Sequence, residues 1–200
     1  YLLEKISIAI ILAVSLSMVV GFLGELSLGH AGFMCVGAYL GGKTAVVLVN
    51  NFNLSHFPTL LISVVVGGLV AALFGIIIGL PALRLRGDYL AIVTLAFGEI
   101  VRSIFMNSSD ESFGGSLGLK TIRYDKNHLF IIAFVLVLIT LAVTQNLIRS
   151  KHGRAITAIR DNEIAAKAMG INVTFYKLFV FVIAAAFAGV AGTFYGHSNT

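Results

Sequence analysis

Residues 59–83 read TLLISVVVGGLVAALFGIIIGLPAL, a stretch of 25 residues without a single charged side chain. An α-helix of this length measures about 37 Å, which exceeds the thickness of a bilayer's hydrocarbon core, about 30 Å. The rest of the chain agrees with this stretch, because 58% of its 200 residues are hydrophobic and only 12% are charged. Soluble domains carry about 25% charged residues. The sequence therefore predicts an integral membrane protein and excludes a water-soluble domain.

Five more apolar runs are long enough to enter a membrane, at residues 6–24, 31–49, 89–106, 129–148 and 178–196. We predict an all-α fold, a polytopic transmembrane helical bundle of about six membrane-inserted segments, as one domain over residues 1–200. The chain opens at Tyr1 without a methionine and stops at Thr200 just past an apolar run. We therefore expect it to be a fragment of a longer polypeptide.

The distribution of basic residues predicts which connections face the cytoplasm. Residues 149–177 carry six lysines and arginines against two acidic residues, a net +4 of the chain's formal +5. Lys and Arg collect in cytoplasmic loops, so this loop is predicted to be cytoplasmic. Alternation along the chain then makes 107–128 external, 84–88 internal and 50–58 external. The net positive charge thus indicates membrane topology, and we expect no nucleic-acid partner.

The junction between the first two segments allows two interpretations. Only Glu25, Ser27 and His30 interrupt the apolar pattern there, with Gly29 and Gly32 on either side of the histidine. The junction is either a tight cytoplasmic turn or a break within one helix inside the membrane. Transporters place broken helices at their substrate sites, so the three polar residues are candidates for a translocation path. Catalysis by these residues is not expected, since the chain has no Gly-x-Ser-x-Gly elbow.

A second polar group lies inside the predicted span 89–106. If that helix begins near Asp88, Glu99 lies about 16 Å deeper, close to the bilayer centre. Arg102 and Ser103 share its side of the helix, and an unpaired charge at that depth costs several kcal/mol. Glu99, Arg102 and Ser103 are therefore either part of a translocation path or a structural pair buried against another helix.

Residues 37–44, GAYLGGKT, match the Walker A letters but not its context. The pattern needs a strand before it, a helix after it and water around the nucleotide, whereas here it lies within an apolar run. The chain has one cysteine, Cys35, and no Cys/His spacing typical of a metal site. We expect no metal, no cofactor bound by this chain, no catalytic residues and no enzymatic activity.

Small residues recur four positions apart in the predicted spans, as expected for close helix packing in lipid. The pairs are Gly37 and Gly41, Gly75 and Gly79, Ala185 and Gly189, and Ala188 and Gly192.

The loop 149–177 contains a short predicted helix. Asp161 or Asn162 can cap its N-terminus, it runs over residues 163–169, and Gly170 is the expected C′ residue. Glu163 and Lys167 are spaced to pair one turn apart. A small apolar face is formed by Ile164, Ala165, Ala168 and Met169. So short a helix is marginal alone in water, so it either docks onto another molecule or lies as a solvated loop on its own bundle.

Several stretches resemble one transporter family. Residues 163–170 (EIAAKAMG), with Glu163, Ala165, Ala166 and Gly170, resemble the "EAA" cytoplasmic loop of ABC-importer permeases. Further matches are 24–33 (GELSLGHAGF) with 37–39 (GAY), 85–95 (LRGDYLAIVTL) running into 98–102 (GEIVR), 153–155 (GRA) with 158–163 (AIRDNE), and the external 114–119 (GGSLGL). In this order they are similar to the LivM-type permease subunit of branched-chain amino acid ABC importers.

The resemblance implies a multi-pass permease domain in the lipid of a bacterial cytoplasmic membrane. It further implies a second permease subunit of LivH type, two ATP-binding subunits that hold the ATP, and an extracytoplasmic substrate-binding protein. By this resemblance, residues 149–177 are the coupling loop, and the short helix in this loop enters a groove of the ATPase. The cargo is branched-chain amino acids or related small polar solutes. A urea/amide or nucleoside/sugar permease of the same superfamily stays open, and so does an ion-coupled secondary transporter centred on Glu99.

Overall fold

The computed structural model describes residues 2–52, 55–83, 85, 87–108, 113–115, 118–119, 121 and 126–198. Within these ranges the chain is helical and contains no β-strand, and six helices are long and apolar enough to cross a membrane. Their bounds are Leu2–Ser17 for α1, continued by the π-helix η1 at Met18–Leu23, His30–Phe52 for α2, His56–Ala82 for α3, Asp88–Met106 for α4, Lys126–Arg149 for α6 and Val173–Ser198 for α9. The predicted all-α membrane bundle is confirmed.

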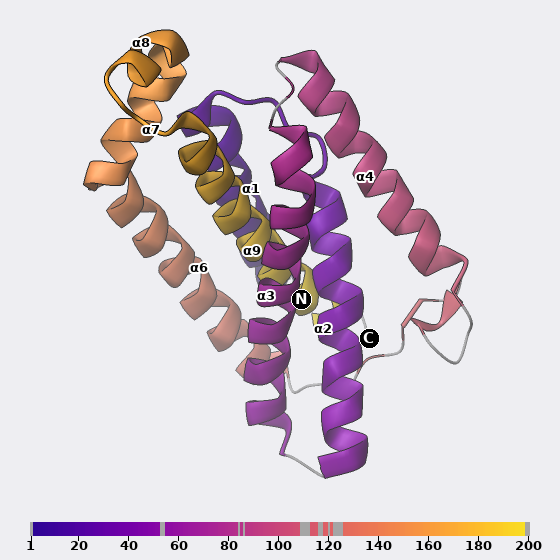
Figure 1. Ribbon diagram of the computed structural model, residues 1–200. Helices are drawn as coiled ribbons and strands as arrows, with labels where there is room; N and C mark the ends of the chain where they lie inside the picture. The colour runs from indigo at the N-terminus through magenta and orange to yellow at the C-terminus, as the bar shows by residue number, and fades with distance from the viewer. Residues whose placement is uncertain are drawn as a thin grey trace.

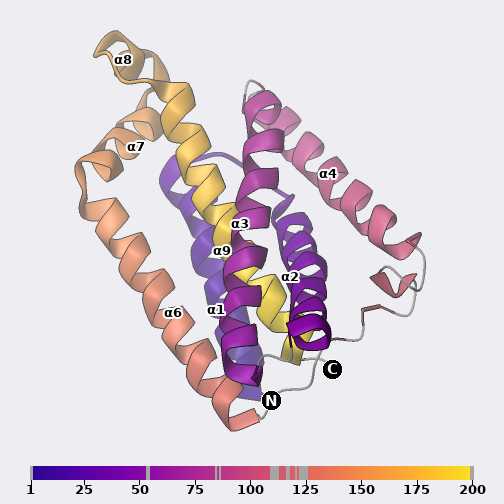
Figure 2. The same cartoon turned by 60° about the horizontal axis from the view of Figure 1, so that its bottom comes forward.

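Successive spans run in opposite directions, so their connections gather at two ends of the bundle (Figures 1 and 2). One end carries two short helices, α7 at Lys151–Asp161 and α8 at Glu163–Ala168. The α1–α2 and α3–α4 connections lie at the same end (Figure 1). This grouping is the one that the alternation of charged loops predicts. Arg84 and Arg86 lie outside the described residues, as do 109–112, 116–117, 120 and 122–125 of the predicted external loop.

The connection between α1 and α2 is a turn between two antiparallel helices (Figure 1). Helix η1 ends at Gly24, which adopts φ +78°, a backbone conformation that glycine accepts without strain. Residues 24–29 then carry the chain to the start of α2 at His30. Of the two interpretations of this junction, the turn is the one found. Its irregular part is the π-helical last turn of the first span.

Small residues hold α2, α3 and α9 together. A Cβ atom on Gly37 would collide with the backbone of Gly189 in α9, and a Cβ on Gly67 in α3 would collide with Thr193. The Thr193 hydroxyl donates to the Gly37 carbonyl at 2.9 Å, a distance reached only because the helices are this close. The predicted packing by small residues is confirmed. Residues 37–44, with the Walker A letters, lie inside α2 at this interface.

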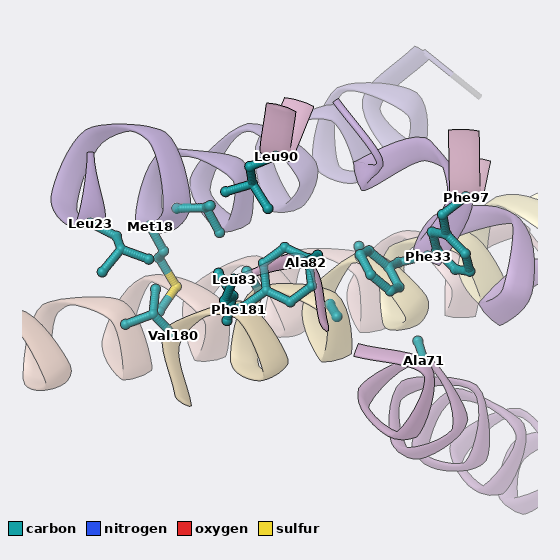
Figure 3. Packing of buried hydrophobic residues seen from close by; sticks show 14 of the residues in the cluster. Met18, Leu23, Phe33, Ala71, Ala82, Leu83, Leu90, Phe97, Val180 and Phe181 are labelled. Carbon is teal, nitrogen blue, oxygen red and sulfur yellow. The ribbon is translucent and has the colours of Figure 1, made fainter. Parts of the chain in front are cut away.

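Aromatic and aliphatic side chains fill the space between α2, α4 and α9. The ring of Phe33 lies 5.0 Å from that of Phe97 and 5.5 Å from that of Phe181, measured between centroids. Figure 3 shows these rings, with Met18 of η1 beside Val180 of α9 further along the same cluster. The hydrophobic core therefore continues from the middle of the bundle to the end that carries α7 and α8.

Candidate functional site

Helix α8 is closed at both ends by local hydrogen bonds. Of the two predicted caps, Asn162 is the one used, since its Oδ1 accepts from the Ala165 N–H at 3.0 Å. At the other end the Gly170 N–H donates to the Lys167 carbonyl and the Ile171 N–H to the Ala166 carbonyl, each at 3.1 Å, with Gly170 at φ +82°. This is a Schellman motif. The expected stop at Gly170 is confirmed, and it fixes the length of α8.

The apolar residues predicted for docking are exposed on α8, together with Lys167. Ile164 is 78% exposed and Met169 is 82% exposed, and Ala165 and Ala168 lie exposed beside them. Ala166 alone on α8 is buried, in a small cluster with residues of α7 and α9. Figures 1 and 2 show α8 at the tip of the molecule. The described part of the chain therefore leaves the predicted docking face uncovered, which is typical of an interaction site.

Helix α7 supports α8 and was not predicted. Ser150 caps it by accepting from the Gly153 N–H at 3.2 Å, and Ile156 and Ile159 are buried against the bundle. A serine cap followed by isoleucines three apart is a weak signal for a helix. Basic residues within this stretch favoured its assignment to a loop.

A buried ion cluster joins α8 to the bundle. The Lys177 ammonium donates to a carboxylate oxygen of Glu25 and, at 3.2 Å, to Oε2 of Glu163. The Lys177 side chain is 7% exposed and that of Glu25 is 13% exposed. Lys177 was assigned to the loop 149–177, but α9 begins at Val173, so this lysine lies in α9. Glu163 was expected to pair with Lys167, one turn along α8; the structure places it against Lys177.

Ser27 of the α1–α2 connection and His30 at the start of α2 also lie against the interior of the fold. Ser27 is buried, and the His30 ring lies 2.7 Å from the Ser15 hydroxyl of α1, measured from Nε2 to Oγ. The sequence groups Glu25, Ser27 and His30 as one candidate translocation path. The structure instead distributes them between an ion pair, the protein interior and a contact between helices.

Glu99 and Arg102 pair on the open side of α4. Arg102 Nη1 lies 3.2 Å from Glu99 Oε2, and the Arg102 side chain is 62% and the Glu99 side chain 65% exposed. With Ser103, Met106 and Asn107 they line a shallow depression. In the described residues, Glu99 and Arg102 are therefore not buried against another helix, contrary to one of the two interpretations of this pair. A charge within a membrane span is costly when it faces lipid alone, and such residues usually face another protein surface or water.

The fold and these features define a multi-pass helical membrane protein with a short helix at one end whose apolar residues are exposed. A sequence model of the family described as the branched-chain amino acid transport system permease component matches residues 1–200. The chain belongs to this family of permeases.

Two relatives are the high-affinity branched-chain amino acid transport system permease proteins LivM of Salmonella typhimurium and Escherichia coli. Each is 39% identical to this chain over 94% of it. A probable LivH permease of Methanocaldococcus jannaschii is 27% identical over 78% of the chain and 53% of its own length. The chain spans about half the length of the LivM relatives, 50% of each. No solved structure matches the chain.

Proposed function

We propose that the chain is the membrane-spanning part of an ABC-importer permease that moves branched-chain amino acids across a bacterial cytoplasmic membrane. The observation that carries this proposal is the capped helix α8 with its uncovered apolar face. The partners are a second permease of LivH type, two ATP-binding subunits and an extracytoplasmic substrate-binding protein. The family match and the LivM relatives support the cargo class.

In this proposal the energy for transport reaches the chain through a protein contact. Transport against a gradient needs an energy source, and the only stretch resembling a nucleotide site lies inside α2, where its backbone N–H groups belong to a packed helix. Helix α8 offers a rigid, protruding element whose length its two caps fix. We assign Glu163, Ile164, Ala165, Ala166, Ala168, Met169 and Gly170 to the coupling site. ATP is bound by the partner subunits, and the end with α7 and α8 faces the cytoplasm.

The polar side of α4 is the proposed translocation path. Glu99, Arg102 and Ser103 face away from the core, whereas Leu90, Phe97 and other apolar residues of α4 are buried against it. A hydrated path shared with the second permease gives these charges the solvation that lipid lacks.

Replacing Glu99 by glutamine is expected to reduce leucine uptake at least tenfold, because Arg102 then stands without its counter-charge in the path. The amount of assembled complex should not change, since the pair is exposed in this chain. The matched control is Asp88→Asn, at the start of the same helix and exposed. Unchanged uptake would exclude Glu99 from the path, and loss of assembly would place it in a buried interface.

Uptake into proteoliposomes separates this function from its alternatives. The permeases, ATP-binding subunits and binding protein are reconstituted and supplied with labelled leucine. We expect uptake that requires ATP and persists when ionophores remove ion gradients. Uptake that follows an ion gradient without ATP would identify the secondary transporter centred on Glu99. ATP-driven uptake of urea in preference to leucine would identify the urea/amide permease.

A further inference from the structure

Lys177 binds two segments that are far apart in the sequence. Glu25 belongs to the α1–α2 connection and Glu163 is the first residue of α8, and the carboxylates of both accept from the same buried ammonium. A buried lysine is costly unless it is paired, so both carboxylates are held close to it. The position of α8 is therefore linked to that of the connection through one cation on α9.

Helix α7 makes a second link to the same connection. Arg160 Nη1 donates to the carbonyl of Gly21 in η1 at 3.1 Å. The aliphatic stem of Arg160 also lies against Gly24, where a Cβ atom would be 2.8 Å from Arg160 Cγ. The contact falls on a π-helical turn, and irregular turns of this kind occur often at functional sites. The beginning of the connection is thus held from both α7 and α9.

The end of the connection contacts α4. The Leu28 N–H donates to the Thr94 hydroxyl at 3.0 Å, and a Cβ on Gly29 would lie 2.9 Å from Thr94 Cβ. Thr94 precedes Glu99 by five residues, about 7.5 Å along the helix. Residues 24–29 therefore extend from the ion cluster beneath α8 to the helix that carries the polar side.

We propose that residues 24–29 transmit movement of α8 to α4, and that Lys177 is the positioning residue that makes this connection follow α8. The inference rests on the proposed function, because it assumes that an ATPase moves α8. When α8 shifts, Glu163 moves with it, and Lys177 must either follow with Glu25 or lose one carboxylate. Because losing a carboxylate is costly for a buried lysine, Lys177 follows and carries Glu25 with it, and the change reaches the connection and, through Leu28 and Gly29, Thr94.

The test compares transport with hydrolysis in the assembled importer. Reconstituted complexes receive labelled leucine and the binding protein, and the leucine moved per ATP hydrolysed is measured. The main variant is the double replacement Glu25→Gln and Lys177→Met, which removes the buried ion pair, keeps the side-chain sizes close and changes no residue of the proposed coupling site. We expect the ATP-binding subunits to remain bound, hydrolysis without substrate to continue, and the leucine moved per ATP to fall at least tenfold.

The control is Lys151→Met, which removes an exposed lysine at the same end of the bundle. It should leave the ratio unchanged, which separates the buried cluster from general loss of charge. A wild-type ratio in the double variant would overturn the linkage. Should the double variant not assemble, Glu25→Gln alone decides by the same ratio, because Lys177 keeps Glu163 there: a tenfold fall supports the linkage and no change overturns it. Failure of the wild-type complex to use ATP would instead overturn the proposed function, and the linkage with it.

Discussion

Replacing Gly189 by leucine is expected to prevent the bundle from packing. A Cβ atom at Gly189 would already lie 2.7 Å from the Gly67 carbonyl oxygen and would collide with Ala71 of α3. On the other side of α9, the Gly189 backbone lies against Gly37 of α2. A leucine side chain therefore forces α9 away from α3, at a cost of about 3 kcal/mol or more, the upper end for overpacked cores. The yield of monodisperse protein in detergent should fall to a small fraction of the wild-type yield.

The matched control for this variant is Gly21→Leu. A Cβ atom at Gly21 has no neighbour within 4 Å, and its backbone is not among those at positive φ. This variant should be recovered in normal amount. Wild-type recovery of Gly189→Leu, with an unchanged unfolding midpoint in sodium dodecyl sulfate, would show that α2, α3 and α9 are not held together as described.

Replacing Ala165 by glutamate is expected to abolish ATP-driven leucine uptake. Ala165 is exposed on the apolar side of α8, so the chain should fold and insert normally. A carboxylate on this face would be buried without a partner when α8 docks. The cost of such a charge, about 3 kcal/mol or more, weakens association over a hundredfold. Uptake into proteoliposomes and retention of the ATP-binding subunits on the purified permease measure the effect.

The control for this variant is Ala165→Ser, which keeps the side chain small and uncharged. It should retain both uptake and the ATP-binding subunits. Full activity of Ala165→Glu would mean that the face is solvated in the working protein, and the coupling assignment would then be wrong.

The sequence predicted those features of the molecule that depend on local pattern. Uncharged runs such as 59–83 indicate spans because only apolar side chains are stable in the hydrocarbon core of a bilayer. The ends of α8 follow from Asn162 and Gly170, because a capping residue bonds to backbone groups within about four residues of itself. Helix α7 was missed because its buried isoleucines are few and its basic residues are typical of a loop. Its orientation on the bundle depends on tertiary packing.

The ion cluster could not be predicted from the sequence. Glu25 and Lys177 are 152 residues apart, and no periodicity relates them. A lysine within a basic loop and a glutamate in a polar turn each look solvated on their own. The same argument explains Glu25, Ser27 and His30, whose grouping reflects closeness in sequence and not a shared surface. Glu99 could be predicted as a candidate site residue because a charge deep within a membrane span is costly and therefore rare.

Cross-linking from α8 tests the central claim most directly, that this helix contacts an ATPase. Met169 is replaced by cysteine in a chain whose native Cys35 is alanine, and the assembled importer is treated with a short thiol-reactive photo-cross-linker. Because Met169, the residue directly after α8, is 82% exposed, we expect a covalent product with the ATP-binding subunit. Cysteine at Ser55, beside α3 at the opposite end, should give none. A complex that transports leucine with ATP yet gives no product from position 169 would contradict the account.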